Sequence, residues 1–141
     1  MDYRVELEAR RGILLLAFQN NLTESSFMAG FFAAAAFART NPVEGVITDL
    51  TEVEEFVVSG DRVREFVDSY PPIAPTKLRA VVAPRDDAYG IARMFQIYRQ
   101  STDTGLKVFR SMDEAWKLMG LDSPVFKPIP YLSAQQIRTS D

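Results

Sequence analysis

The chain has 141 residues and a formal net charge of −3, from 16 Lys plus Arg against 19 Asp plus Glu, a length typical of one domain. It is 47% hydrophobic and 25% charged, which is typical of a soluble globular domain and gives no positive excess that would favour nucleic acid. The absence of cysteine excludes disulfides, thiolate nucleophiles and Cys-based metal sites. The absence of histidine excludes a Ser-His-Asp triad and imidazole ligands.

The first forty residues predict a β-hairpin followed by a helix. Apolar and polar residues alternate over 3–9, Gly12 permits a tight turn, and the apolar run 13–18 predicts a strand covered on both faces. Thr23 is placed to cap a helix over 24–39. The predicted core stripe of this helix contains Phe27, Met28, Phe31, Phe32, Ala35 and Ala38.

Phe37 falls on nearly the opposite side of this helix from the predicted core stripe. One interpretation is that another element of the same chain covers the ring. The other is that Phe37 contacts a second subunit or a partner protein.

Strands and helices alternate in the rest of the predicted domain. The predicted elements are a strand over 45–50, an acidic link over 51–55, a helix from Ser59-Gly60 to Pro71, a strand over 77–83, a helix from Asp86 or Asp87 to Tyr98, a strand over 106–109, and a helix between a Ser111–Glu114 capping box and Gly120. The order β-β-α-β-α-β-α-β-α predicts an α/β fold, with a five-stranded, mostly parallel sheet covered by about four helices.

The predicted domain spans residues 1–121, and a different kind of segment follows. Residues 122–141 contain three prolines and several apolar side chains without a helical or strand period. We expect an extended tail that lies on its own domain or on a neighbouring subunit.

Targeting, membrane and cofactor motifs are missing from the sequence. The start of the chain is too polar for a signal peptide, and the longest apolar stretches are shorter than the roughly 20 residues of a membrane helix. Neither G-x-G-x-x-G nor a P-loop motif occurs. We therefore expect a cytoplasmic protein without a membrane span, a cofactor or a bound metal.

Two clusters of polar residues admit a functional and a structural interpretation. Asp49 and the following Glu52, Glu54 and Glu55 lie near the end of a predicted strand, where they form either a Mg²⁺ site or a solvated acidic loop. Tyr89 and Arg93 form an i, i+4 pair near a helix start, which contacts an anion or is an ordinary polar helix face.

Ser59 also has two interpretations. As an N-cap it satisfies free N–H groups of the following helix. As a phosphorylation site it would place a phosphate at a helix N-terminus, with Arg62 and Arg64 nearby.

The segment Asp49-Leu-Thr-Glu-Val-Glu-Glu-Phe-Val-Val-Ser59-Gly60 resembles the D-L-S-x-V-x-x-I-D-S-S-G segment of STAS domains, the fold of sulphate-transporter tails and of SpoIIAA-like anti-sigma-factor antagonists. The element order over about 3–120 also looks like that fold. A more specific similarity, to a bacterial STAS-like branch of uncharacterised small proteins, lies in Val81-Val-Ala-Pro84, Tyr89-Gly-Ile-Ala-Arg-Met-Phe95, Val108-Phe-Arg110 and Glu114-Ala-Trp116.

The resemblance implies a non-enzymatic module that regulates by binding an unknown protein partner. Its contact region would contain Phe56, Ser59, Gly60 and Arg62, with Ser59 at the position that antagonists phosphorylate. Val57 and Val58 replace the aspartate and first serine of the family segment, so the acidic character of that site is lost.

Two further hypotheses come from other classes of function. The first is binding of a lipid or small apolar ligand, because the related SEC14-type folds use such pockets. A ligand near this edge of the sheet would contact Asp49, Tyr89 and Arg93. The second, a carboxylate and Mg²⁺-dependent enzyme, is the least favoured.

Exposed apolar residues predict a homodimer. The candidate interface residues are Phe37 on the first helix and Phe126 and Tyr131 in the tail.

Overall fold

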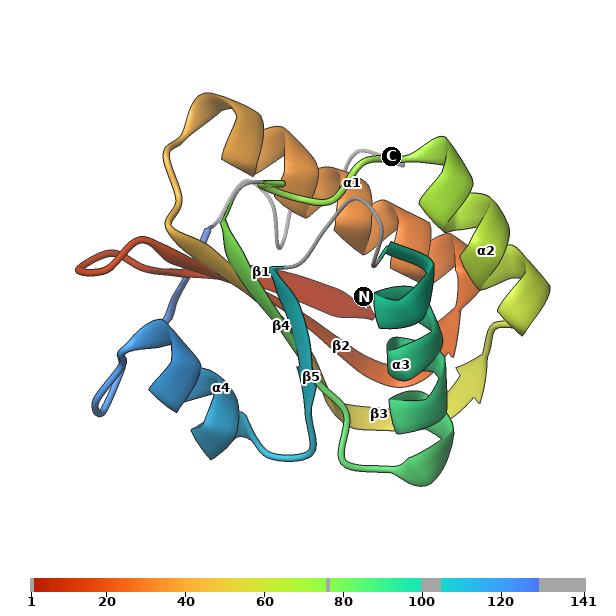
Figure 1. Cartoon of the computed structure of the whole chain (residues 1–141). Coiled ribbons are helices and arrows are strands. Elements are labelled where there is room, and N and C mark those ends of the chain that lie inside the picture. Colours follow the sequence, from red (N-terminus) through yellow and green to blue (C-terminus); the bar gives the residue numbers. More distant parts are fainter. Residues whose placement is uncertain (1, 76, 100–104, 130–141) are drawn as a thin grey trace.

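A mixed β-sheet runs through the middle of the molecule, with helices on both faces (Figure 1). The computed structural model describes residues 2–75, 77–99 and 105–129. Within these ranges the strands are β1 (Tyr3–Glu8), β2 (Ile13–Thr23), β3 (Gly45–Val57), β4 (Leu78–Val82), β5 (Leu106–Phe109) and β6 (Lys127–Pro128). The helices described are α1 (Glu24–Thr40), α2 (Gly60–Ser69), α3 (Asp86–Arg99) and α4 (Met112–Met119). The α/β class is therefore confirmed.

The order of the strands across the sheet is β5-β4-β3-β2-β1-β6. The neighbours from β2 to β5 are parallel, because helices carry the chain back between them. β1 is antiparallel to β2, as expected for a hairpin whose turn contains Gly12 at a φ of +73°. The described part of the sheet has six strands rather than the predicted five.

The additional strand comes from the start of the predicted tail. Lys127 and Pro128 pair with Leu7 and Glu6 of β1, and the Ile129 N–H donates to the Val5 carbonyl at 3.0 Å. This part of the tail lies on its own chain. The tail beyond Ile129 falls outside the described residues.

Two central strands are longer than the sequence predicts. β2 continues past Phe18 to Thr23 through two register shifts, and the acidic segment 51–55 belongs to β3 rather than to a link. Leu22 and Phe56 are paired near the ends of these strands. The extension brings the N-termini of α1 and α2 close together at this edge of the sheet.

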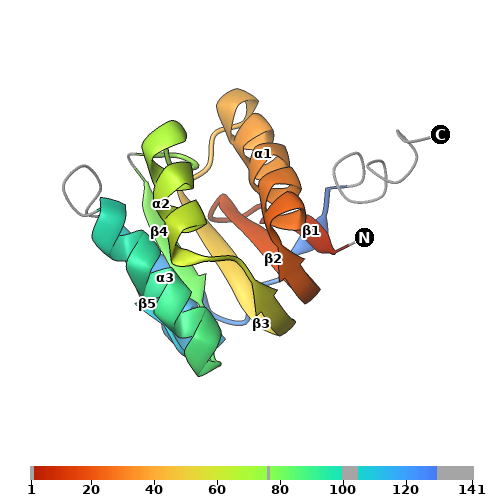
Figure 2. The same cartoon turned by 90° about the vertical axis from the view of Figure 1, so that its right-hand side faces the viewer.

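The helices divide unequally between the two faces. α1, α2 and α3 lie side by side on one face (Figure 2), and α4 lies on the other. On β2, Leu14 and Leu16 pack on the three-helix face, while Ile13 and Leu15 pack on the α4 face. This alternation explains the uninterrupted apolar run at the start of β2.

The buried side of α1 agrees with the prediction only in part, because the predicted stripe except Phe32 lies in or packs against the core. Gly30, Phe31, Ala34 and Phe37 are buried, whereas Phe32 is 43% exposed. Gly30 permits a close approach to β2, because a Cβ there would lie 2.7 Å from Cε1 of Phe18. The expectation that Phe37 forms an interface is therefore wrong: elements of the same chain cover the ring, which is only 8% exposed.

Helix caps follow the predicted chemistry. The Thr23, Ser59 and Ser111 side chains accept hydrogen bonds from backbone N–H groups of the helices that they precede, and Gly120 ends α4 at a φ of +70°. In the predicted capping box the Glu114 carboxylate would accept from the Ser111 backbone N–H. Instead, this carboxylate accepts from Oγ of Ser111 at 3.1 Å. Within the described ranges, no helix has the length and apolar character needed to cross a membrane.

Candidate functional site

A cavity of about 280 Å³ lies between the sheet and the three helices on its larger face. Its lining comes from β2, β3, β4 and β5 below and from α1, α2 and α3 above. The volume is just under the roughly 300–1,000 Å³ typical of sites for small ligands. The lining is mainly apolar, so the cavity favours an apolar occupant.

Phenylalanine rings from all three helices line this cavity. The centroid of Phe66 on α2 lies 5.0 Å from that of Phe27 and 4.6 Å from that of Phe31, both on α1. It also lies 5.6 Å from the centroid of Phe95 on α3. These tilted and edge-to-face contacts hold the helices together around the space, and their ring edges and faces are the surface that a ligand would meet.

One end of the cavity reaches the protein surface at the N-termini of α1 and α2. Arg62 on α2 contacts Glu24 of α1 at 3.3 Å and Glu65 at 2.8 Å, and all three line the cavity. Their side chains are each more than half exposed. The hydrogen bond that Arg62 donates to Glu65 and the negative charges of Glu24 and Glu65 raise the pKa of Arg62, which therefore remains a cation in this network.

Two buried arginines line the cavity away from this exposed network. Arg79 on β4 is 5% exposed and Arg99 at the end of α3 is 4% exposed. Nη1 of Arg79 donates to the Ala74 carbonyl at 3.3 Å, and the Arg99 guanidinium lies 5.5 Å from the Phe95 ring centroid. The apolar cavity thus has two cationic groups in its wall.

Burial changes the proton affinity of both arginines. Loss of hydration lowers the pKa of Arg79. Loss of hydration, and then the nearby charge of Arg79, lowers the pKa of Arg99 to about 10. Both groups remain protonated at neutral pH, but their charged forms are held in a low-dielectric environment.

Neither arginine was predicted from the sequence to line a site, although the spacing of both carried a signal. Arg79 is two residues before Val81 and therefore faces the same side of β4. Arg99 follows Phe95 by four residues and Ala92 by seven, so it extends the buried stripe of α3.

The predicted contact region divides between the cavity and the helix cap. Phe56 and Arg62 line the cavity, whereas Ser59 is exposed and its Oγ accepts from the Arg62 N–H at 3.3 Å. Gly60 allows close packing of α2 on α3, because a Cβ there would lie 2.4 Å from Cε of Met94. Ser59 is therefore the N-cap of α2.

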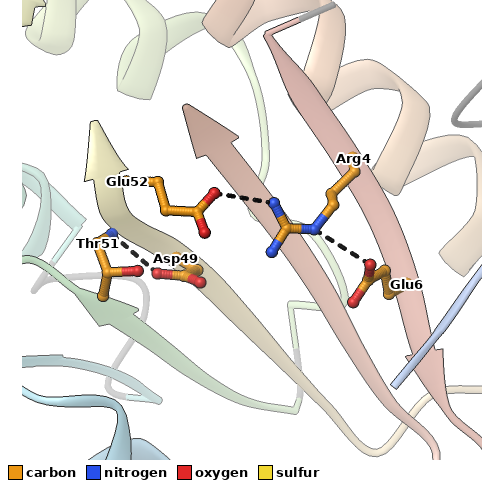
Figure 3. A network of polar contacts seen from close by, with 5 residues as sticks. All are labelled: Arg4, Glu6, Asp49, Thr51 and Glu52. Atoms are coloured by element: carbon orange, nitrogen blue, oxygen red, sulfur yellow. Dashed lines mark hydrogen bonds and ion pairs between the residues drawn. The ribbon is translucent and has the colours of Figure 1, made fainter. Parts of the chain in front are cut away.

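The structure places Asp49, Tyr89 and Arg93 in three separate environments. Asp49 pairs with Ala17, a residue of the cluster on the α4 face, and its Oδ1 accepts from the Thr51 N–H at 2.9 Å (Figure 3). The neighbours of Asp49 in the strand, Thr48 and Leu50, line the cavity on the other face. Asp49 therefore does not line the cavity.

Tyr89 and Arg93 have partners other than each other. The guanidinium of Arg110 lies 4.0 Å from the Tyr89 ring centroid, whereas Arg93 is exposed and contacts Gln96. Neither Tyr89 nor Arg93 lines the cavity.

The acidic residues of β3 make contacts within the protein. Arg4 of β1 reaches across the sheet to Glu52 at 3.2 Å and also contacts Glu6 at 3.1 Å (Figure 3). The Glu54 carbonyl accepts from the Arg85 guanidinium. Across the described parts of the chain, acidic residues form no group of three that could hold a metal ion.

The two candidate interface residues of the tail differ in what the structure describes. Phe126 is half-buried and packs against the apolar cluster on the α4 face of its own chain. Tyr131 lies outside the described residues. A scan against protein-family models and a search of curated proteins give no match to this chain.

Proposed function

We propose that this protein is a non-enzymatic module that binds a small apolar ligand in the cavity under α1, α2 and α3. The single observation that carries the proposal is the cavity of about 280 Å³ with its lining of phenylalanine rings. Protein cores are normally close-packed and contain few voids larger than a water molecule. A preformed space whose volume is close to that of small-ligand sites therefore favours a binding function.

The proposed fold class is STAS-like. The helices and strands through α4 follow the order implied by that resemblance, which supports this proposal. The cavity lies at Phe56 and Arg62, within the region that the resemblance gives to partner contacts. We therefore favour ligand binding over partner binding as the main function. We call the surface around the cavity opening, at Phe56 and Arg62, the cavity rim.

A neutral fluorescent probe tests ligand binding without involving charge. N-phenylnaphthylamine is titrated into ligand-stripped protein, and the increase in its fluorescence is recorded. We expect saturable binding by the natural sequence. Ala92→Phe should abolish this binding, because Ala92 lines the cavity and is only 4% exposed.

The matched control places the same ring outside the cavity. Ala36 is on the exposed side of α1, so Ala36→Phe should leave probe binding unchanged. Thermal unfolding of both variants verifies that they are folded. Equal binding by a folded Ala92→Phe variant and by the natural protein would show that the probe occupies another place, and the proposal would fail.

A second candidate function is contact with a protein partner at the cavity rim. Val57, which is 55% exposed, adjoins the exposed Ser59, and this arrangement favours an accessible contact surface. Phosphorylation of Ser59 by an extract of the host cell, mapped by mass spectrometry, tests the regulatory form of this proposal. No modification of Ser59 would contradict it.

We also propose a homodimer, now without Phe37 as a contact. The outward side of α1 carries Phe32, which is 43% exposed and supports an alternative contact. Light scattering should give the mass of two chains, and a strict monomer at high concentration would overturn the proposal.

A further inference from the structure

The exposed part of the cavity lining comes from the facing sides of α1 and α2. Among the described residues that line the cavity, the exposed ones are Glu24 on α1 and Arg62, Glu65 and Ser69 on α2. The three residues of α2 follow one another at intervals of three and four, so they lie along one face of that helix. The opening of the cavity therefore lies between α1 and α2.

The junction between α2 and α3 is closed by comparison. α2 lies between α1 and α3 on this face of the sheet (Figure 2). The four α3 residues in the cavity lining, from Ile91 to Arg99, are all buried or half-buried. α2 also packs closely on α3 at Gly60, where Met94 leaves no room for a Cβ. A ligand therefore has a more accessible route between α1 and α2.

One ion pair spans this opening. Nε of Arg62 lies 3.3 Å from Oε2 of Glu24, and this contact joins α2 to α1. The second contact of Arg62, to Glu65 at 2.8 Å, remains within α2. Phe27 and Phe66 also line the cavity, and their rings meet edge to face across the same two helices at a centroid distance of 5.0 Å. A molecule that passes between the helices here must separate these contacts.

We propose that the ligand enters and leaves the cavity between α1 and α2, and that the Arg62–Glu24 ion pair is a gate across this opening. This inference rests on the proposed ligand-binding function and adds the route and its control. Both side chains of the pair are more than half exposed. An exposed ion pair changes an equilibrium by only about 1.4- to 5-fold and is weakened by salt. The gate therefore opens readily, and its strength depends on ionic strength.

A gate has a kinetic signature that a ligand contact lacks. The pair joins the two helices whether the cavity is empty or filled. Weakening it therefore raises the rates of entry and of exit by the same factor, and the affinity, which is the ratio of the two rates, stays the same. Loss of a group that contacts the bound ligand would instead raise the exit rate alone and lower the affinity.

The primary experiment measures both rates in the natural protein. Ligand-stripped protein in excess is mixed with N-phenylnaphthylamine in a stopped-flow fluorimeter, and the dependence of the observed rate on protein concentration gives the association and dissociation rate constants. Raising NaCl from about 0.01 M to about 1 M shortens the screening length from about 30 Å to about 3 Å. We expect both rate constants to rise by roughly 1.4- to 5-fold. Salt that only strengthened apolar burial would slow dissociation, so faster dissociation reports the ion pair.

Variants then assign the salt effect to this pair. Arg62→Met keeps an unbranched apolar stem without the charge, and Glu24→Gln removes the opposite charge. Each should raise both rate constants at low salt by the same roughly 1.4- to 5-fold and remove the response to salt. Arg64→Met is the matched control. Arg64 is an exposed arginine of α2 whose guanidinium lies 5.5 Å from the Tyr98 ring centroid on α3, so this variant should leave both rates unchanged.

A covalent link between the helices tests the route itself. The chain contains no cysteine, so a pair of introduced cysteines can be joined specifically. Glu24→Cys with Arg62→Cys, joined by a short bismaleimide before the probe is added, should lose probe entry. Arg64→Cys with Tyr98→Cys, joined in the same way, links α2 to α3 and should retain it.

The outcomes separate this inference from the proposed function. A dissociation rate that does not rise with salt, or probe entry at the natural rate after α1 and α2 are linked, would overturn the proposed gate and route. Saturable binding of N-phenylnaphthylamine would then leave the ligand-binding function intact. Absence of probe binding by the natural protein would overturn both. The salt comparison uses the natural protein, so it remains decisive even where a variant fails to fold.

Discussion

The two faces of the sheet are packed in different ways. On the α4 face, one short helix approaches closely: a Cβ at Gly45 would lie 2.6 Å from Sδ of Met119, and Ala115 is completely buried. On the opposite face, three helices meet through large rings and leave a cavity of about 280 Å³. Small residues allow close packing, whereas helices held apart by rings create space for a ligand.

The largest effects are expected from removing a large side chain on each face. Phe66→Ala should lower the free energy of unfolding by about 3–5 kcal/mol, because Phe66 joins the three helices. Met119→Ala should lower it by about 2–5 kcal/mol by leaving a new void under α4. Urea unfolding measures both changes. A loss below about 1 kcal/mol for Phe66→Ala would show that the rings do not hold the three-helix face together.

Glycine substitutions distinguish close packing from open surface. Gly30→Ala should destabilise the protein by about 1–3 kcal/mol, because the added Cβ would lie 2.7 Å from the buried Phe18 ring. In α3 a Cβ at Gly90 has nothing within 4 Å, so Gly90→Ala should stabilise the protein by about 0.5–1 kcal/mol. Denaturant midpoints that shift in the same direction for both variants would contradict this assignment.

The N-caps of α2 and α4, which lie on opposite faces of the sheet, allow a comparison of two smaller effects on the free energy of unfolding. Ser59 caps α2 and Ser111 caps α4, with Oγ accepting from the Arg62 N–H at 3.3 Å and the Glu114 N–H at 3.4 Å. Replacing either serine with alanine should lower the free energy of unfolding by about 1 kcal/mol. A loss at Ser111 without one at Ser59 would indicate that Ser59 has a role other than capping.

The smallest expected effect near neutral pH comes from the protonation of Arg99, whose contribution to the free energy of unfolding changes with pH. Burial and the charge of Arg79 lower the pKa of Arg99 to about 10 in the folded protein. Above that pH, the unfolded chain retains a proton that the folded protein releases, so the contribution of Arg99 raises the free energy of unfolding as pH increases. Below it, both states are protonated and the full penalty of burying the charge remains.

Urea unfolding of the natural protein and of Arg99→Met, at about pH 8 and about pH 11, measures this contribution. The natural protein should gain stability relative to the variant at the higher pH. A difference between the two proteins that does not change with pH would argue against the lowered pKa.

Local sequence signals predicted most of the fold. The alternation in β1, the apolar run in β2, and the serine caps are effects of neighbouring residues, and they place the elements correctly. The buried side of α1 was predicted only in part, with Phe32 exposed and Phe37 buried contrary to expectation, because six alanines and four phenylalanines leave little contrast around the helix. The close approach of Gly30 to the Phe18 ring is one of the contacts that fix the rotation of α1.

The candidate site was predicted only in part. Phe56 and Arg62 were identified from the strand-to-helix segment, and both line the cavity. The space itself depends on the packing of three helices far apart in the sequence, which no single segment encodes. Arg79 and Arg99 were missed because arginine is ordinarily read as a surface residue.

Methyl NMR with N-phenylnaphthylamine tests the difference between the two faces most directly. The ring currents of the bound probe should shift the methyl signals of Val46 and Ile91, which line the cavity, and leave those of Ile13 and Ile47 on the α4 face unchanged. Shifts confined to the three-helix face are the result that we predict. Shifts of Ile13 and Ile47, or no shifts at saturating probe, would contradict a ligand-binding cavity under α1, α2 and α3.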